Sequence, residues 1–174
     1  MDHTDHVNLL RDGVSAPGGT WADLGCGAGA FTLALAELVG DAARIYAVDQ
    51  NAGALRTNAE SMRRRFPHVL VHYQTVDFTQ PMELPELDGI VIANSLHFQR
   101  AQSVVVSLLR GYLREGGRIV VVEYNIEQGN SGVPHPVPYR RWEDLAREAG
   151  FEHTELLRTR PSRFLREIYS AVSW

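Results

Sequence analysis

Short apolar runs alternate along the chain with stretches in which apolar residues recur every three or four positions. The runs predict buried strands, and the periodic stretches predict amphipathic helices. The predicted strands span residues 20–24, 44–48, 69–76, 87–93 and 118–123. The predicted helices span 3–12, 29–39, 51–65, 102–113 and 139–149, with Gly116-Gly117 stopping the fourth. This alternation indicates an α/β protein built on a mainly parallel sheet.

The end of the chain follows a different pattern. Two β-rich stretches near 152–158 and 166–174 flank Pro161-Ser162, close enough to pair as an antiparallel hairpin. Residues 125–138 form one long irregular stretch that is rich in glycine and proline. Connections of this length in a compact chain are often functional. We therefore weigh a lid over the binding site against an ordered crossover.

Composition narrows the class of protein. A chain of 174 residues with 44% hydrophobic content suits one domain over 1–174, with 1–19 as a short leading helix and linker. The net charge of −4 argues against DNA or bulk RNA as a partner. The polar start, the absence of a long apolar run and the single cysteine predict a cytoplasmic protein without a membrane span. The sequence leaves open whether the protein forms a homodimer.

The strongest candidate site is the glycine-rich segment 23–29, between the first strand and the helix that follows. Gly25, Gly27 and Gly29 let the backbone approach a ligand that a Cβ atom would exclude. Free N–H groups at the start of the helix can meet a carboxylate or phosphate. Asp49 ends the next strand, where a carboxylate can accept two hydrogen bonds from a ribose diol. The segment predicts a nucleoside-bearing ligand.

The glycine spacing does not name that ligand, because it also fits the dinucleotide pattern of NAD sites. Asp23 precedes the first glycine by two residues, where a dinucleotide site more often has an apolar residue. Polar residues also follow the third and fourth strands, at Asp77 and at Asn94-Ser95. A single nucleoside with a short charged tail would meet all of these strand ends.

With these motifs in view, the chain resembles the class I S-adenosylmethionine-dependent methyltransferases over nearly its whole length. Segments 23–29, 48–51, 76–78 and 94–97 fall where that family has its first four motifs. The resemblance implies a three-layer α-β-α Rossmann-like sheet with strand order 3-2-1-4-5-7-6 and an antiparallel seventh strand. It also implies methyl transfer from S-adenosylmethionine to a small-molecule acceptor.

The resemblance assigns roles to individual residues. It implies that Asp49 binds the ribose hydroxyls, that Gln50 lies beside the adenine, and that Asp77 and Phe78 contact the adenine amino group and ring. The implied cofactor set is Asp23, Gly25, Cys26, Gly27, Gly29, Asp49, Gln50, Asp77, Phe78, Asn94 and Ser95. Nothing resembles the metal-binding acid cluster of catechol-type members or the Asn-Pro-Pro-Tyr motif of many nucleic-acid amino methyltransferases. The short leading helix indicates a reduced N-terminal lid.

Methyl transfer depends mainly on alignment, and a base is needed only when the acceptor must lose a proton. His97, just past the fourth strand, is the first candidate base; a helix-entry histidine bonded to the backbone is the alternative. Tyr124 ends the fifth strand at the same edge and is the second catalytic candidate. We interpret Glu123 as a satisfied strand-end acid and Cys26 as a small loop residue.

Two other functions stay open. An NAD-dependent oxidoreductase is disfavoured because the chain leaves no room for a substrate domain. The chain also contains no lysine, and hence no Tyr-x-x-x-Lys pair. A non-catalytic subunit that binds S-adenosylmethionine and needs a partner to act is compatible with the reduced N-terminal lid.

Overall fold

The computed structural model describes residues 1–14, 16–162 and 164–174. Within these ranges one sheet contains seven strands in the order β3-β2-β1-β4-β5-β7-β6. The strands are β1 (Thr20–Leu24), β2 (Arg44–Val48), β3 (Leu70–Gln74), β4 (Leu87–Ala93), β5 (Leu113–Tyr124), β6 (Thr154–Pro161) and β7 (Glu167–Ser173). Strand β7 runs antiparallel to both β5 and β6, whereas the other neighbours are parallel. The predicted strand order and the antiparallel seventh strand are confirmed.

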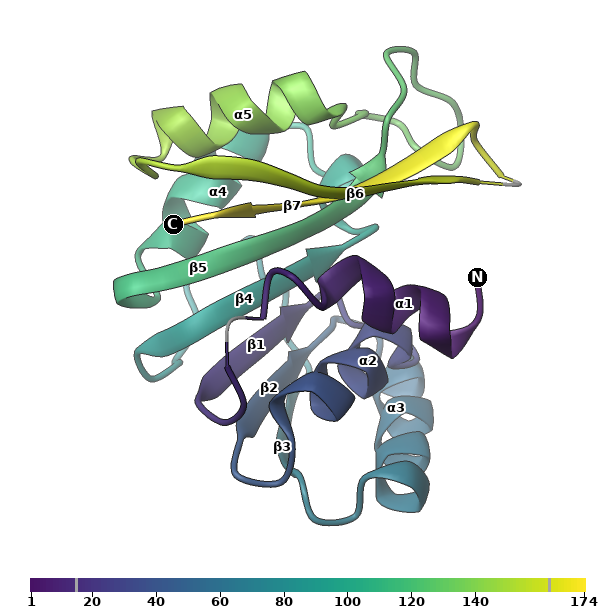
Figure 1. Cartoon of the computed structure of the whole chain (residues 1–174), viewed down its shortest axis with the longest axis vertical. Coiled ribbons are helices and arrows are strands. Elements are labelled where there is room, and N and C mark those ends of the chain that lie inside the picture. The colour runs from purple at the N-terminus through teal and green to yellow at the C-terminus, as the bar shows by residue number, and fades with distance from the viewer. Residues whose placement is uncertain (15, 163) are drawn as a thin grey trace.

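Helices cover both faces of the sheet. They are α1 (His3–Leu10), α2 (Ala30–Val39), α3 (Ala52–Arg65), α4 (Gln102–Arg110) and α5 (Tyr139–Glu148), with a short 3-10 helix η1 (Leu96–Phe98). Figure 1 shows α1, α2 and α3 gathered on one side of the sheet and α4 and α5 on the other. The predicted three-layer arrangement is therefore present. In the described ranges no helix has the length and apolar character needed to cross a membrane.

The central strands are apolar on both faces because each face is covered. Trp21, Val91 and Val120 pack with α1, α2 and α3. Alternate residues such as Leu24 and Ile92 point the other way, into the cluster formed with α4 and α5. This two-sided burial explains why the strands read as continuous apolar runs.

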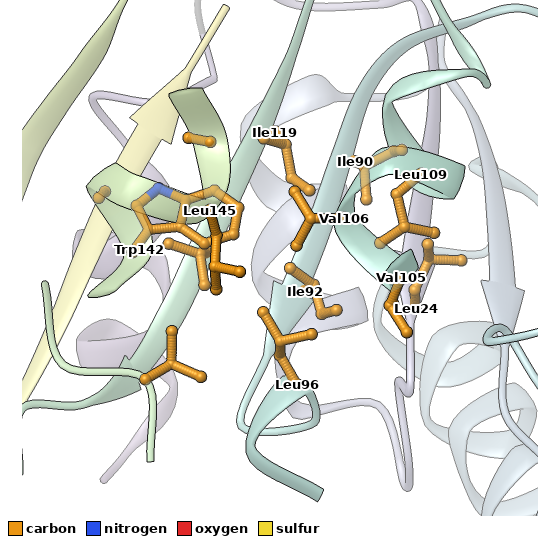
Figure 2. Packing of buried hydrophobic residues seen from close by; sticks show 14 of the residues in the cluster. Leu24, Ile90, Ile92, Leu96, Val105, Val106, Leu109, Ile119, Trp142 and Leu145 are labelled. Atoms are coloured by element: carbon orange, nitrogen blue, oxygen red, sulfur yellow. The ribbon is translucent and has the colours of Figure 1, made fainter. Parts of the chain in front are cut away.

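The second cluster holds the sheet against α4 and α5 (Figure 2). Ile90, Ile92 and Ile119 of the sheet face the helix residues, and Trp142 and Leu145 close one end. The indole N–H of Trp142, fully buried, donates to the hydroxyl of Ser173 across 3.1 Å. This packing fixes the carboxyl ends of β4 and β5, from which several candidate site residues extend.

The predicted boundary between the fourth helix and the fifth strand is wrong. The helix expected over 102–113 ends at Arg110, and β5 begins at Leu113, well before Gly116-Gly117. Leu113 and Arg118 pair with Leu87 and Gly89, so five steps along β5 match two along β4. The extra residues form a bulge, in which Gly116 has a φ of +71°. Leu113 continues the helical spacing of Leu109, which explains the error.

The irregular segment 125–138 lies outside helices and strands, as predicted. Its second half is anchored to the core. His135 N–H donates to the His97 carbonyl (3.0 Å), and the Tyr169 hydroxyl donates to the Val137 carbonyl (2.8 Å). Val133 and Val137 are buried. Asn125 is also tied down, because its N–H donates to the Glu167 carbonyl (3.0 Å). A lid role for residues 125–138 stays a prediction.

Candidate functional site

A cavity of about 210 Å³ opens at the carboxyl ends of β1, β2 and β4. Parallel sheets bind ligands at this edge, where the loops diverge. The cavity is lined by Gly25, Asp49, Gln50, Val76, Asp77, Phe78, Asn94, Ser95, Phe98 and Gln99. Segments that are far apart in the sequence therefore converge on one site.

Most of the predicted cofactor residues line this cavity, but Asp23, Cys26, Gly27 and Gly29 do not. Three lining residues were not predicted: Val76, Phe98 and Gln99. Val76 lies within the predicted segment 76–78, and Phe98 and Gln99 follow the segment 94–97. The sequence therefore indicated their neighbourhood but not that their side chains face the cavity. Phe98 is 56% exposed, which is unusual for a phenylalanine beside a buried strand end.

The three glycines of the loop have different structural roles. A Cβ atom on Gly25 would lie 2.5 Å from Ser95 Cβ, and one on Gly29 would lie 2.5 Å from Asn58 Cγ. Packing within the protein thus demands glycine at both positions. Gly27 has a φ of +52°, and a Cβ atom there would meet nothing within 4 Å. Of the three, Gly27 presents the open backbone surface suited to a ligand.

Asp49 ties this loop to the next helix. Its Oδ2 accepts from Gly27 N–H and its Oδ1 from Asn51 N–H, both at 2.8 Å. Asn51 in turn caps α3 by accepting from Gly53 and Ala54 N–H. Each carboxylate oxygen has a second lone pair, so Asp49 can still accept bonds from a diol. The existing bonds hold its side chain at the cavity wall.

Asp23 lies beneath the loop rather than in the cavity. It is 1% exposed, and its Oδ2 accepts a 2.6 Å hydrogen bond from the Thr32 hydroxyl. Burial raises the pKa of Asp23 to about 7; the Thr32 bond opposes this rise, and the negative charge of Asp49 adds to it. The side chain therefore supports the loop from below.

Cys26 is also a buried loop residue. Burial raises the pKa of its thiol well above the ordinary range, and the charges of Asp23 and Asp49 add to the effect. Its sulfur accepts a 3.5 Å bond from Asn58 Nδ2. A thiol that stays protonated is a poor nucleophile. This geometry agrees with the interpretation of Cys26 as a small loop residue.

Two polar groups at the cavity have unused hydrogen-bonding capacity. Asn94 has a φ of +51°, and its buried Oδ1 has no hydrogen-bond partner among the described residues. Asp77 accepts from the N–H and hydroxyl of Thr79 through Oδ1, which leaves Oδ2 available within the same ranges. Together with the open backbone at Gly27, these acceptors fit a ligand rich in hydroxyl and amino groups.

His97 and Glu123 form a buried pair behind the cavity. Nδ1 of His97 lies 2.6 Å from Oε2 of Glu123, and His97 N–H donates to Oε1 across 3.2 Å. The two residues are 2% and 0% exposed. The interpretation of Glu123 as a satisfied acid is incomplete, because its partner is the candidate base itself.

Four neighbouring aromatic rings, one of them that of His97, form a row between two exposed phenylalanines. Ring centroids are separated by 4.3 Å for Phe98–His97, 6.1 Å for His97–Tyr124 and 5.7 Å for Tyr124–Phe164. We call these four residues the aromatic row. Phe98 lines the first cavity, whereas Tyr124 and Phe164 line a second cavity of about 460 Å³. The row therefore connects two hollows at the same end of the sheet.

Tyr124 is unsuited to act as a base. Burial raises the pKa of its hydroxyl, and the negative charge of Glu123 raises it further. The phenol consequently stays neutral at physiological pH. Its side chain can still donate a hydrogen bond or form an apolar wall.

Comparison with known proteins identifies the family. Residues 16–155 match the model of the methyltransferase domain family. The chain belongs to this family. The match implies S-adenosylmethionine rather than NAD as the nucleoside ligand.

Individual relatives are more distant. A protein of Methanothermobacter thermautotrophicus named "probable cobalt-precorrin-6B C(15)-methyltransferase (decarboxylating)" is 29% identical over 106 residues, which cover 60% of this chain and 52% of the relative. The matched region thus spans about half of that relative.

Two solved structures illustrate the shared fold. One, an S-adenosylmethionine-dependent methyltransferase of Aquifex aeolicus, has a TM-score of 0.72 and 15% identity, with 99% of this chain and 98% of that chain covered. The other is magnesium protoporphyrin IX methyltransferase of Synechocystis PCC 6803 with bound S-adenosylmethionine. It has a TM-score of 0.69 and 18% identity over 98% of this chain and 77% of that chain.

Proposed function

We propose that residues 1–174 act as one domain that transfers a methyl group from S-adenosylmethionine to a small-molecule acceptor. The observation that carries the proposal is the cavity at the carboxyl ends of β1, β2 and β4. It is lined by Asn94, whose buried Oδ1 has no partner among the described residues, and by Asp77, whose Oδ2 is available. The family match supports the same activity.

Different residues at and beside the cavity would bind different parts of S-adenosylmethionine. Gly27, which does not line the cavity itself but donates its N–H to the lining residue Asp49, would receive the charged tail. Asp49 would bind the ribose hydroxyls. Gln50, Asp77 and Phe78 would surround the adenine. The donor supplies a methyl group activated by a sulfonium charge, so the protein has mainly to align the acceptor and exclude water.

A small acceptor is supported by the aromatic row and by the acidic net charge of −4. Phe98 and Phe164 are exposed rings on which a flat apolar molecule can stack, whereas a polyanion requires a basic surface. Two similar proteins are named for small molecules, cobalt-precorrin-6B and magnesium protoporphyrin IX. We assign His97 the role of base and Tyr124 that of a wall of the acceptor site.

Calorimetry tests the donor. S-adenosylhomocysteine and S-adenosylmethionine should bind the purified chain, and NAD should not. Gly27→Ala should abolish this binding while the protein stays folded. The added Cβ would meet no protein atom within 4 Å, but it would occupy the space in which the ligand is expected. Gly150→Ala is the matched control, since Gly150 also has a positive φ (+90°) and no neighbour within 4 Å. Tight NAD binding without a response to S-adenosylhomocysteine would refute the proposal.

The non-catalytic alternative has a separate test. The purified chain is incubated with S-adenosylmethionine and acceptor candidates, and S-adenosylhomocysteine release is measured. Turnover by the chain alone excludes a required partner. Binding of the donor without turnover, restored by a fraction of cell extract that contains protein, would favour a subunit that needs a partner.

A further inference from the structure

A separate cavity of about 180 Å³ opens at the amino ends of β1, β4 and β5. It lies at the other end of these strands from the cavity proposed to bind S-adenosylmethionine, which we call the donor cavity. Asp88 of β4 and Arg114 and Arg118 of β5 are the charged residues that line it. The two cavities share no lining residue, so the proposed methyl transfer gives this one no role.

The bulge in β5 brings the two arginines to one cavity. Leu113 pairs with Leu87 and Arg118 with Gly89, so five steps along β5 match two along β4. Two steps of a strand span about 7 Å, whereas five regular steps would span about 17 Å. The bulge folds the intervening residues back, which lets Arg114 and Arg118 line the same small space. Bulges re-aim side chains in this way beside functional sites.

Asp88 holds the first of these arginines in place. Its Oδ1 accepts from Nε of Arg114 at 2.6 Å, and its Oδ2 accepts from Thr20 N–H at 2.7 Å. Nη1 of Arg114 donates to the Glu115 carbonyl at 2.7 Å. A Cβ atom on Gly19 would lie 2.8 Å from Oδ2, so glycine at this position leaves room for the carboxylate. Among the described residues, Nη2 of Arg114 keeps its N–H groups for a ligand.

Arg118 carries a charge that no acid neutralises within the described ranges. Its guanidinium carbon lies 5.9 Å from the ring centroid of Trp174. A guanidinium stacked on a ring keeps the N–H groups in its own plane available for an anion. Two guanidinium groups and one carboxylate give the cavity a net positive charge, in a chain whose net charge is −4.

We propose that this cavity binds a small phosphate monoester, whose oxygens are shared between Arg114 and Arg118. Guanidinium groups match phosphate oxygens in geometry and form charge-assisted hydrogen bonds with them. A carboxylate, with two oxygens and one charge, needs only one guanidinium, whereas a phosphate monoester has a third terminal oxygen and a second charge for the other. Pro17 and Trp21 offer apolar contact to a short substituent. Sites for drug-sized ligands measure roughly 300–1,000 Å³, so the smaller volume here favours a small ester.

Binding is tested by ³¹P NMR titration of phenyl phosphate with the purified full chain, at an ionic strength held constant with sodium chloride. We expect saturable binding. Benzoate, which has the same ring and a single charge, should displace the ester only at concentrations at least about tenfold higher. Absence of saturation below about 10 mM, above the usual range of KM values for small substrates, would refute the proposal. Displacement by benzoate at equal concentration would refute the assignment to phosphate.

Substitutions at Arg118 test the site itself, because this side chain takes part in no ion pair among the described residues. Arg118→Gln should weaken phenyl phosphate binding at least about tenfold, the loss expected for hydrogen bonds to a charged group. Arg118→Lys keeps the charge without the planar fork and should give an intermediate loss. Arg64→Gln is the matched control, since Arg64 is exposed on α3 and bonds only the Ser61 hydroxyl, at 3.4 Å. Equal losses at Arg118 and Arg64 would show that net charge alone attracts the ester, and would overturn the proposal.

S-adenosylhomocysteine separates this inference from the proposed function. Calorimetry should show that phenyl phosphate leaves its affinity unchanged, and that Arg118→Gln binds it as the unmodified protein does. Competition between the two ligands would place the ester in the donor cavity and contradict the inference. If phenyl phosphate binds through Arg118 but S-adenosylhomocysteine does not bind, the proposed methyl transfer is wrong and the phosphate site stands.

Discussion

The burial of Asp23 beneath the glycine loop predicts how the free energy of unfolding depends on pH. The perturbation is Asp23→Asn, which removes the charge and keeps an oxygen that can accept the 2.6 Å bond from Thr32. Burial raises the pKa of Asp23 from 3.8 to about 7 in the folded protein. The folded state therefore binds this proton more tightly than the unfolded state does.

The sign and size of the effect on the free energy of unfolding follow from that difference. The stabilisation associated with the bound proton is fully present below about pH 4 and is lost as the pH rises through 7. At about 1.4 kcal/mol per pKa unit, the total is on the order of 4 kcal/mol. Between pH 5 and pH 8 the unmodified protein should lose about 2–3 kcal/mol relative to Asp23→Asn.

Urea unfolding of both proteins at several pH values between 5 and 8 measures this difference. Taking the difference cancels the titration of every group that the two proteins share. Asp23→Asn should be the more stable protein at pH 8, by an amount that shrinks towards pH 5. A difference independent of pH would show that Asp23 has an ordinary pKa and would refute the role assigned to its burial.

Other substitutions test the site and the loop. Asp49→Ala should weaken S-adenosylhomocysteine binding by about 1.5–3 kcal/mol in calorimetry, the range for hydrogen bonds to a charged group; unchanged affinity would exclude its ribose role. Gly29→Ala should lower the free energy of unfolding by roughly 2 kcal/mol or more, because its Cβ would meet Asn58 at 2.5 Å. Tyr124→Phe should leave turnover within about threefold, because the neutral hydroxyl takes no proton; a larger loss would make Tyr124 catalytic.

The periodic pattern was sufficient to predict the strands, whereas their order in the sheet was implied by the resemblance to the methyltransferases. Strands over Thr20–Leu24, Arg44–Val48 and Leu87–Ala93 were predicted to the residue, since continuous apolar runs between turn residues leave little choice. The predicted boundary between α4 and β5 was wrong because Leu113 fits both the helical and the strand spacing of apolar residues. Its pairing with Leu87, which is distant in sequence, decided the outcome.

The sequence predicted which segments form the site better than it predicted which individual side chains face the cavity. Strand ends converge in a parallel sheet, so Asp49, Asp77 and Asn94 were expected to meet. The sequence did not reveal that Asp23 points beneath the loop, because the direction of a side chain at a strand end depends on the pleat and the turn that follows. The bond between His97 and Glu123 joins two strand ends 26 residues apart, and no local pattern encodes it.

The aromatic row has a consequence for how this protein can change over evolution. His97 is enclosed in the core, whereas Phe98 and Phe164 are 56% and 63% exposed. Substitutions at exposed positions usually change stability by less than about 0.5 kcal/mol. Phe98 and Phe164 can therefore vary to suit new acceptors while the buried chemistry is preserved. On the roles proposed above, reactivity and selectivity would lie on separate residues, so directed evolution of acceptor choice should begin at these two positions.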